Sequence, residues 1–122
     1  MNRIEFEEFV ASEYAVIGEY PWVKYPAFEV FRHKENKKWF AVVMTIDKSK
    51  LGINEKGMID VVNLKCDSFA ISSLCEGKGI YPAYHMSKQH WISVLLDGSV
   101  DSDLIKMLLD VSYALTNHER KS

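Results

Sequence analysis

The residues best suited to chemistry lie in one short segment, YHMSKQHW, residues 84–91. Two histidines stand there on either side of a lysine, and an imidazole can bind a metal, move a proton or form hydrogen bonds. Trp22, in a loop flanked by prolines, offers an aromatic surface for stacking. Trp22, His85 and His90 are therefore our candidate ligand or turn site. The structural alternatives are that the 84–91 turn satisfies buried backbone groups before the next strand and that Trp22 plugs the edge of the core.

The sequence completes no catalytic set around these residues. Cys66 and Cys75 are the only cysteines, and neither lies in a CxxC pair or in a glycine-flanked turn that would activate a nucleophile. Two histidines and one cysteine would give zinc three ligands without the paired spacing of a structural site. We therefore expect buried thiols, no catalytic residues, no metal and no cofactor, and the sequence favours a binding role over an enzymatic one.

Positive charge is concentrated in the middle of the chain, although the formal net charge is −2. The segment RHKENKK, residues 32–38, carries four fixed positive charges and one negative charge. Such a hairpin can lay its cations along a phosphate backbone. Lys48 and Lys50 would extend the row if their loop lies on the same side. The alternative is a solvated hairpin tip kept soluble by lysines. The residues that we expect to contact nucleic acid are Arg32, Lys34, Lys37, Lys38, Lys65 and Lys88.

Hydrophobic periodicity predicts the elements that position these side chains. Apolar residues at helical spacing over 6–17 predict an amphipathic helix that begins after an Asn2 cap and stops at Gly18. Residues 28–33 and 38–46 read as the two strands of a hairpin, and the second is apolar enough to be a central strand. A third strand is expected over 58–66.

The second half of the chain continues with a short helix, one or two strands and a final helix. Asp67 or Ser68 caps the short helix, which runs to Cys75 and counts Phe69 among its apolar members. A strand is expected over 91–96. The last helix follows with an apolar side that shares helical spacing and comprises Leu104, Ile105, Leu108, Val111, Ser112 and Leu115. This order predicts an α+β two-layer sandwich in which an antiparallel β-sheet is covered by the N- and C-terminal helices.

Size and composition bound the remaining expectations. A chain of 122 residues with 48% hydrophobic residues is suited to a single domain, here residues 1–122 with a frayed tail over 119–122. No apolar run approaches the ~20 residues that cross a bilayer, and the N-terminal segment is acidic where a secretory signal is basic. We expect a cytoplasmic protein that is monomeric and does not associate with membranes.

Several blocks of the sequence resemble the MmcQ/YjbR family over roughly residues 20–116. They are FEVFRH (28–33), KWFA (38–41), VVNLKCD (61–67) and YHMSKQHW (84–91), continuing through LDGS (96–99). The resemblance implies an antiparallel sheet backed by helices, similar to the frataxin-like (CyaY-like) architecture, and a DNA-binding role through a pair of β wings. Ser87 stands where the family usually has Asn, and Asp101 where it often has Pro.

Three functions remain open from the sequence. The first is weak, backbone-directed DNA binding through the basic hairpin. The second is a protein-interaction adaptor with chaperone-like properties, whose protein partner would meet Trp22 and Tyr25. The third is a small-ligand binder that uses the turn containing His85 and His90.

Overall fold

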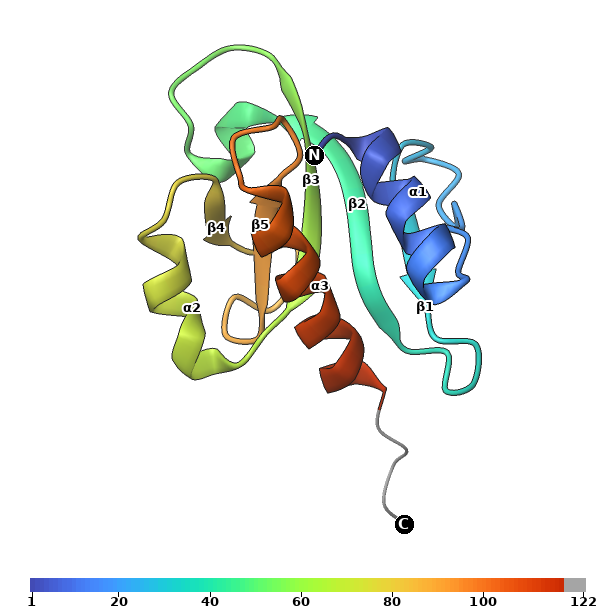
Figure 1. Cartoon of the computed structure of the whole chain (residues 1–122). Helices are drawn as coiled ribbons and strands as arrows, with labels where there is room; N and C mark the ends of the chain where they lie inside the picture. The colour runs from blue at the N-terminus through green and yellow to red at the C-terminus, as the bar shows by residue number, and fades with distance from the viewer. Residues whose placement is uncertain (118–122) are drawn as a thin grey trace.

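The protein is built on a five-stranded antiparallel sheet in the order β1-β2-β3-β5-β4, with three α-helices packed on one face (Figure 1). The structure, a computed structural model, describes residues 1–117; the tail expected over 119–122 lies outside this range. The strands are β1 Glu29–Arg32, β2 Trp39–Asp47, β3 Met58–Lys65, β4 Ile80–Pro82 and β5 Trp91–Leu95. The helices are α1 Arg3–Tyr14, the 3₁₀ turn η1 Lys48–Leu51, α2 Ser68–Cys75 and α3 Ser102–Thr116. The predicted α+β fold is confirmed.

Helix α1 begins where its cap predicts but ends early. The Asn2 side chain accepts a hydrogen bond from the Glu5 N–H, and the Glu5 carboxylate accepts one from the Asn2 N–H, which forms a capping box. The helix stops at Tyr14 because Ala15 adopts a left-handed conformation with φ 56°. The expected continuation through Ile17 is wrong, and that side chain is 78% exposed.

The sheet separates two apolar clusters. The larger cluster, on the helix-covered face, combines α1, α2 and α3 with residues such as Phe31, Val62 and Ile92. The smaller cluster lies on the opposite face, which we call the open face, and contains strand residues such as Val42 and Val61. Loops and the 3₁₀ turn η1, rather than the α-helices, cover the open face. The surface there is therefore formed by loop side chains together with strand residues such as Trp39 of β2.

Strand β2 is central, as its apolar run predicted, but a bulge interrupts its pairing with β1. Phe31 pairs with Ala41 and Arg32 pairs with Trp39, so Phe40 has no partner on β1. Because of the extra residue, the Phe40 side chain points toward the helices and joins the larger cluster together with Ala41, while Trp39 lines a hollow on the open face.

Ser112 of α3 completes the hydrogen bonds that the bulge disturbs. Its hydroxyl donates to the Phe40 carbonyl over 2.6 Å and accepts from the Lys65 N–H over 2.9 Å. Ser112 is fully buried, and this bridge joins β2, β3 and α3. A polar residue on the predicted apolar side of the last helix is thereby explained.

Two predicted core positions are wrong. Phe69 of α2 is 93% exposed and Val111 of α3 is 38% exposed, while Leu109 is fully buried. Helix α2 has only two turns and packs mainly against β4, a short second strand that the sequence left open. Its orientation is set by that contact rather than by its own pattern.

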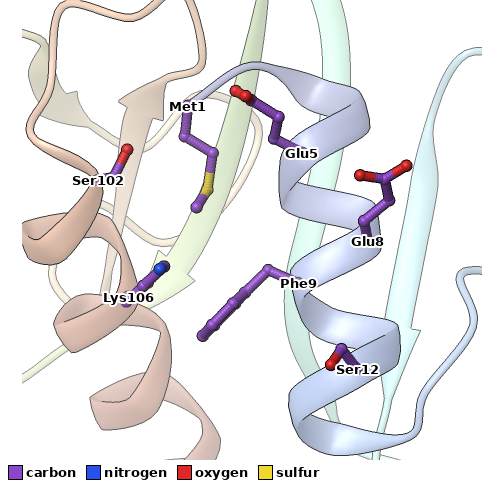
Figure 2. Close-up of a pocket in the computed structure, with 7 residues that line it drawn as sticks. All are labelled: Met1, Glu5, Glu8, Phe9, Ser12, Ser102 and Lys106. Carbon is purple, nitrogen blue, oxygen red and sulfur yellow. The ribbon is translucent and has the colours of Figure 1, made fainter.

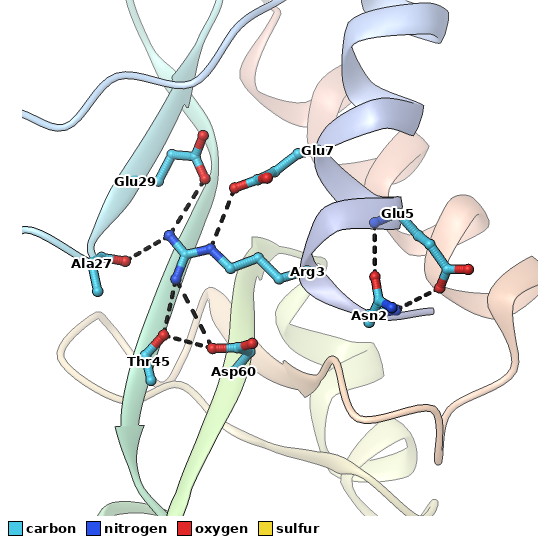
Figure 3. A network of polar contacts seen from close by, with 8 residues as sticks. All are labelled: Asn2, Arg3, Glu5, Glu7, Ala27, Glu29, Thr45 and Asp60. Carbon is cyan, nitrogen blue, oxygen red and sulfur yellow. Dashed lines mark hydrogen bonds and ion pairs between the residues drawn. The ribbon is translucent and has the colours of Figure 1, made fainter.

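Arg3 joins α1 to the sheet and to the loop before β1 (Figure 3). Its guanidinium donates to the Ala27 carbonyl over 2.6 Å and to Thr45 Oγ1 over 2.9 Å. It also forms ion pairs with Glu7 at 3.3 Å and with Glu29 at 3.4 Å, and the Asp60 carboxylate lies 4.0 Å away.

Glu29 is a buried member of this network. Burial raises the pKa of its carboxyl to about 7, and the neighbouring Glu7 carboxylate adds to the increase, while Arg3 acts in the opposite direction. A Cβ at Gly18 would overlap the Glu29 side chain, which would have to move to make room for it. Gly18 therefore packs against the sheet rather than ending a helix.

Candidate nucleic-acid interface and aromatic pocket

The basic hairpin tip between β1 and β2 is held in one conformation by hydrogen bonds. The Lys37 N–H donates to the His33 carbonyl and the His33 N–H to the Lys38 carbonyl. Asn36 accepts from the Lys38 N–H over 2.8 Å and donates to the Thr116 carbonyl at the end of α3 over 2.9 Å. The lysines of the tip thus project from a braced loop.

His33 belongs to the core rather than to the charged surface. The residue is 3% exposed, its ring lies against Phe40 and Tyr113, and its Nε2 is 2.8 Å from Thr116 Oγ1. Burial lowers its pKa, which keeps the imidazole neutral at physiological pH. It anchors the base of the hairpin to α3.

The charged side chains of the hairpin differ in their partners. Lys34, Lys37 and Lys38 are exposed and make no ion pair within residues 1–117. Arg32 is paired with Glu19, which accepts from both its Nε and its terminal nitrogen. The three lysines are therefore the cations most available to an anionic partner, whereas the charge of Arg32 is already paired with Glu19.

Strand register brings the other predicted cations to the same end of the sheet. Lys65 pairs with Trp91, so the end of β3 lies beside the start of β5, and Lys88 stands three residues before the first residue of β5. The hairpin is at this end too, since Ala41 pairs with Leu64. From β1 to β5 the row spans three strand spacings, roughly 14 Å.

Two of these cations have defined surroundings. Lys65 is half-buried, and strand alternation places it on the open face with Val61 and Asn63. The Lys88 ammonium donates to the Ala83 carbonyl over 2.6 Å. Lys88 thus has a backbone partner and contributes charge from a fixed position.

The expected extension of this row by Lys48 and Lys50 is wrong. Both follow β2, whose nine residues span about 30 Å, so they lie at the far end of the sheet from the hairpin (Figure 1). Lys48 is also paired with Glu55 at 3.1 Å.

An aromatic pocket opens on the open face at the hairpin end. It has a volume of ≈ 370 Å³ and is lined by apolar and aromatic groups, namely Trp22, Tyr25, Phe28, Trp39, Val42, His85 and Met86. Trp22 meets Trp39 edge-on with ring centroids 5.5 Å apart, and Tyr25 stacks on Phe28 at 5.1 Å. Tyr25 is 53% and Trp39 37% exposed. Trp22 thus packs on the smaller cluster while forming a wall of the pocket.

A buried polar pair holds one wall of the pocket in place. Asn63 and Ser93 are fully buried partners on β3 and β5, and the Ser93 hydroxyl donates to the Asn63 side chain. Asn63 donates to the Tyr84 carbonyl over 2.8 Å, and the Tyr84 N–H donates to Ser93 over 3.0 Å. These bonds fix the chain directly before His85, which adopts φ 65°.

The two candidate histidines lie in different hollows. His85 is in the aromatic pocket with Trp22, while His90 lines a surface hollow beside Ser68 and Ile71 of α2. Within residues 1–117, no three His, Cys, Asp or Glu side chains converge as a metal ion would need.

The two thiols are poor nucleophiles. Burial raises the pKa of Cys66 to about 11 and also raises that of Cys75. Cys66 is buried and Cys75 is half-buried beside the larger cluster. Neither sulfur can form a thiolate readily at neutral pH.

A second hollow lies between α1 and α3 on the helix side (Figure 2). It has a volume of ≈ 430 Å³, and the Met1 and Phe9 side chains enter it from the α1 side. The Lys106 ammonium lies 4.8 Å from the centre of the Phe9 ring. Glu5 and Glu8 give its rim negative charge, which argues against a phosphate ligand.

The sequence named the cations together with Trp22, Tyr25 and His85, but it missed four of the seven residues that line the pocket. Phe28, Trp39 and Met86 enter it through the bulge and the loop packing, which no local pattern encodes. Asn63 and Ser93 did carry a signal, because a buried polar residue in an apolar strand requires a hydrogen-bond partner.

Fold and surface together define a two-layer α+β protein with a braced basic hairpin next to an aromatic pocket. No helix among residues 1–117 combines the length and apolar character of a membrane span. The YjbR family model matches residues 12–115, so the chain belongs to the YjbR family. The resemblance stated from the sequence is confirmed.

Individual relatives agree with this assignment. The chain is 38% identical over 116 residues to the uncharacterized protein YyaQ of Bacillus subtilis (strain 168), covering 95% of this chain and 98% of YyaQ. A crystal structure from Pseudomonas syringae matches with a TM-score of 0.94 and 43% identity, over 96% of this chain and all of that one.

A solution structure from Pseudomonas syringae matches with a TM-score of 0.87 and 41% identity over the full length of both chains. The Deinococcus radiodurans protein DR2400 shares the fold, with a TM-score of 0.73 and 24% identity over 100% of this chain and 83% of that one.

Proposed function

We propose that this YjbR-family protein binds nucleic acid through the phosphate backbone, with the basic hairpin as the main contact. The observation that supports it best is that Lys34, Lys37 and Lys38 project from a braced tip without an ion pair in residues 1–117. A loop that is already ordered loses less conformational entropy when it binds.

The remaining cations widen the same surface. Lys65 and Lys88 lie at the hairpin end of the sheet, within reach of neighbouring phosphates on one strand. Arg32 keeps Glu19 as a partner and contributes less. Phosphate contacts of this kind carry no sequence information, so binding is weak, nonspecific and dependent on salt.

The test is a fluorescence-anisotropy titration of labelled DNA between about 50 and 200 mM salt, a range over which the Debye length falls roughly twofold. Each phosphate neutralised on duplex DNA contributes about −0.9 to the slope of log K against log salt. The variant Lys34→Gln/Lys37→Gln/Lys38→Gln should therefore flatten the slope by about 2 to 3 and weaken binding at low salt.

A matched control removes the same charge at the other end of the sheet. Lys50→Gln/Lys56→Gln/Lys78→Gln replaces three exposed lysines that make no ion pair within the described residues. It should leave the slope nearly unchanged. Equal losses in both triple variants, or no binding by the wild type at low salt, would exclude the hairpin as a specific phosphate contact.

A further inference from the structure

The aromatic pocket has the attributes of a site for a flat ring. It is lined by Trp39 and Val42 of β2 and by side chains from two loops that cross the open face, residues 20–28 and 83–87. Its ≈ 370 Å³ falls at the lower end of the range for small-molecule sites, which is about 300–1,000 Å³.

The pocket is preformed. Trp22 is braced by edge-on contacts with both Phe28 and Trp39, at 6.3 and 5.5 Å between ring centroids. The wall that carries His85 is held by two hydrogen bonds of the Tyr84 backbone, whose carbonyl accepts from the Asn63 side chain and whose N–H donates to the Ser93 hydroxyl. A ligand therefore finds the rings already in place, while the exposed fractions of Tyr25 and Trp39 leave surface for stacking.

The charge around the pocket decides between a cationic ligand and an aromatic ring that carries a phosphate. Aromatic cages also bind quaternary ammonium groups, but a cationic ligand is favoured only where basic side chains are few. Here Lys65 shares the face of the pocket, Lys38 precedes Trp39, and Lys88 is fixed to the loop that carries His85. This surround repels a cation and suits an aromatic ring that carries a phosphate.

We propose that the pocket takes one unstacked nucleobase of a single strand whose phosphates lie along the hairpin lysines. This inference rests on the proposed function and adds to it a preference for single-stranded over duplex nucleic acid. Aromatic side chains next to a cationic track are the usual means by which proteins bind single strands with little sequence preference. Every base has a π-face, so Trp39 and Tyr25 can stack on any base without hydrogen bonds to its edge.

The experiment compares two decamers that have the same phosphates. One is oligothymidine, and the other carries an abasic tetrahydrofuran unit at every position. Stacking of one base contributes about 5- to 100-fold in affinity. The wild type should therefore bind oligothymidine at least about fivefold more tightly than the abasic strand, and duplex DNA more weakly than oligothymidine.

Variants locate the effect. Trp39→Ala should bind both decamers with the affinity that the wild type has for the abasic one. Tyr25→Ala, in an exposed loop position where folding is less at risk, should lose part of the preference. Phe69→Ala removes an aromatic ring that is 93% exposed on α2 and should change nothing.

The outcomes separate the two proposals. Equal affinity of the wild type for both decamers overturns the base pocket and leaves the hairpin proposal standing, whereas no binding to either decamer at low salt overturns both. A preference that survives Trp39→Ala and Tyr25→Ala overturns the location. Displacement of oligothymidine by N-acetyltryptophanamide at lower concentration than by thymidine 5′-monophosphate would indicate a protein partner and overturn the nucleobase.

Discussion

Replacing Ser112 by Ala tests how the bulge in β2 is held. The hydroxyl of Ser112 lies between two strands and is bonded to the Phe40 carbonyl at 2.6 Å and the Lys65 N–H at 2.9 Å. Alanine is nearly isosteric and keeps the helix, so the substitution removes this bridge and little else. No water can readily replace it, because Ser112 and Phe40 are both fully buried.

The magnitude follows from the two backbone groups that lose their partner. A buried donor or acceptor without a hydrogen bond costs about 1–3 kcal/mol, and the higher helix propensity of alanine returns about 0.5 kcal/mol. We expect Ser112→Ala to lower the free energy of unfolding by about 2–4 kcal/mol. For a chain of this size, that corresponds to a Tm lower by about 10 °C.

Urea denaturation followed by tryptophan fluorescence measures this change, with the midpoint shifting and the m-value unchanged. Ser73→Ala is the matched control, since Ser73 is an exposed serine within α2. It should stay within about 0.5 kcal/mol of the wild type. If Ser112→Ala were no more destabilising than Ser73→Ala, the hydroxyl bridge would not be what closes the bulge.

Three further predictions concern buried groups. Burial raises the pKa of Glu29 to about 7 from an ordinary 4.5, so between these pH values the carboxyl is protonated in the folded protein and ionised in the unfolded chain, and stability falls as the pH rises. Glu29→Gln should remove up to about 3 kcal/mol of this loss. Parallel Tm–pH curves for the two proteins would contradict the prediction. Gly79→Ala should lower the free energy of unfolding by about 2–4 kcal/mol in urea denaturation, because φ is +85° and the new Cβ would lie 2.4 Å from Val100. Gly77→Ala should cost far less, and similar costs for both variants would contradict this reasoning. Cys66, with a pKa of about 11, should react with Ellman's reagent at pH 8 only as fast as the protein opens, so reaction of the native thiol within seconds would refute its burial.

Local signals in the sequence were sufficient for the elements themselves. Asn2 and Asp67 cap their helices as expected, since a cap depends on residues within one turn. The apolar run of β2 identified a central strand because only a strand covered on both faces tolerates it. The sequence also identified the cations of the hairpin tip, because a polar turn between two strands must be exposed.

Tertiary structure decided which side chains meet. The bulge at Phe40 moves Trp39 to the open face, and this depends on pairing with β1 and on Ser112, which is 72 residues away from Phe40. Strand register likewise joined Lys65 to the hairpin end and separated Lys50 from it. Register and loop packing are properties of contacts between distant segments, so a local pattern predicts the residues of a site but not their assembly.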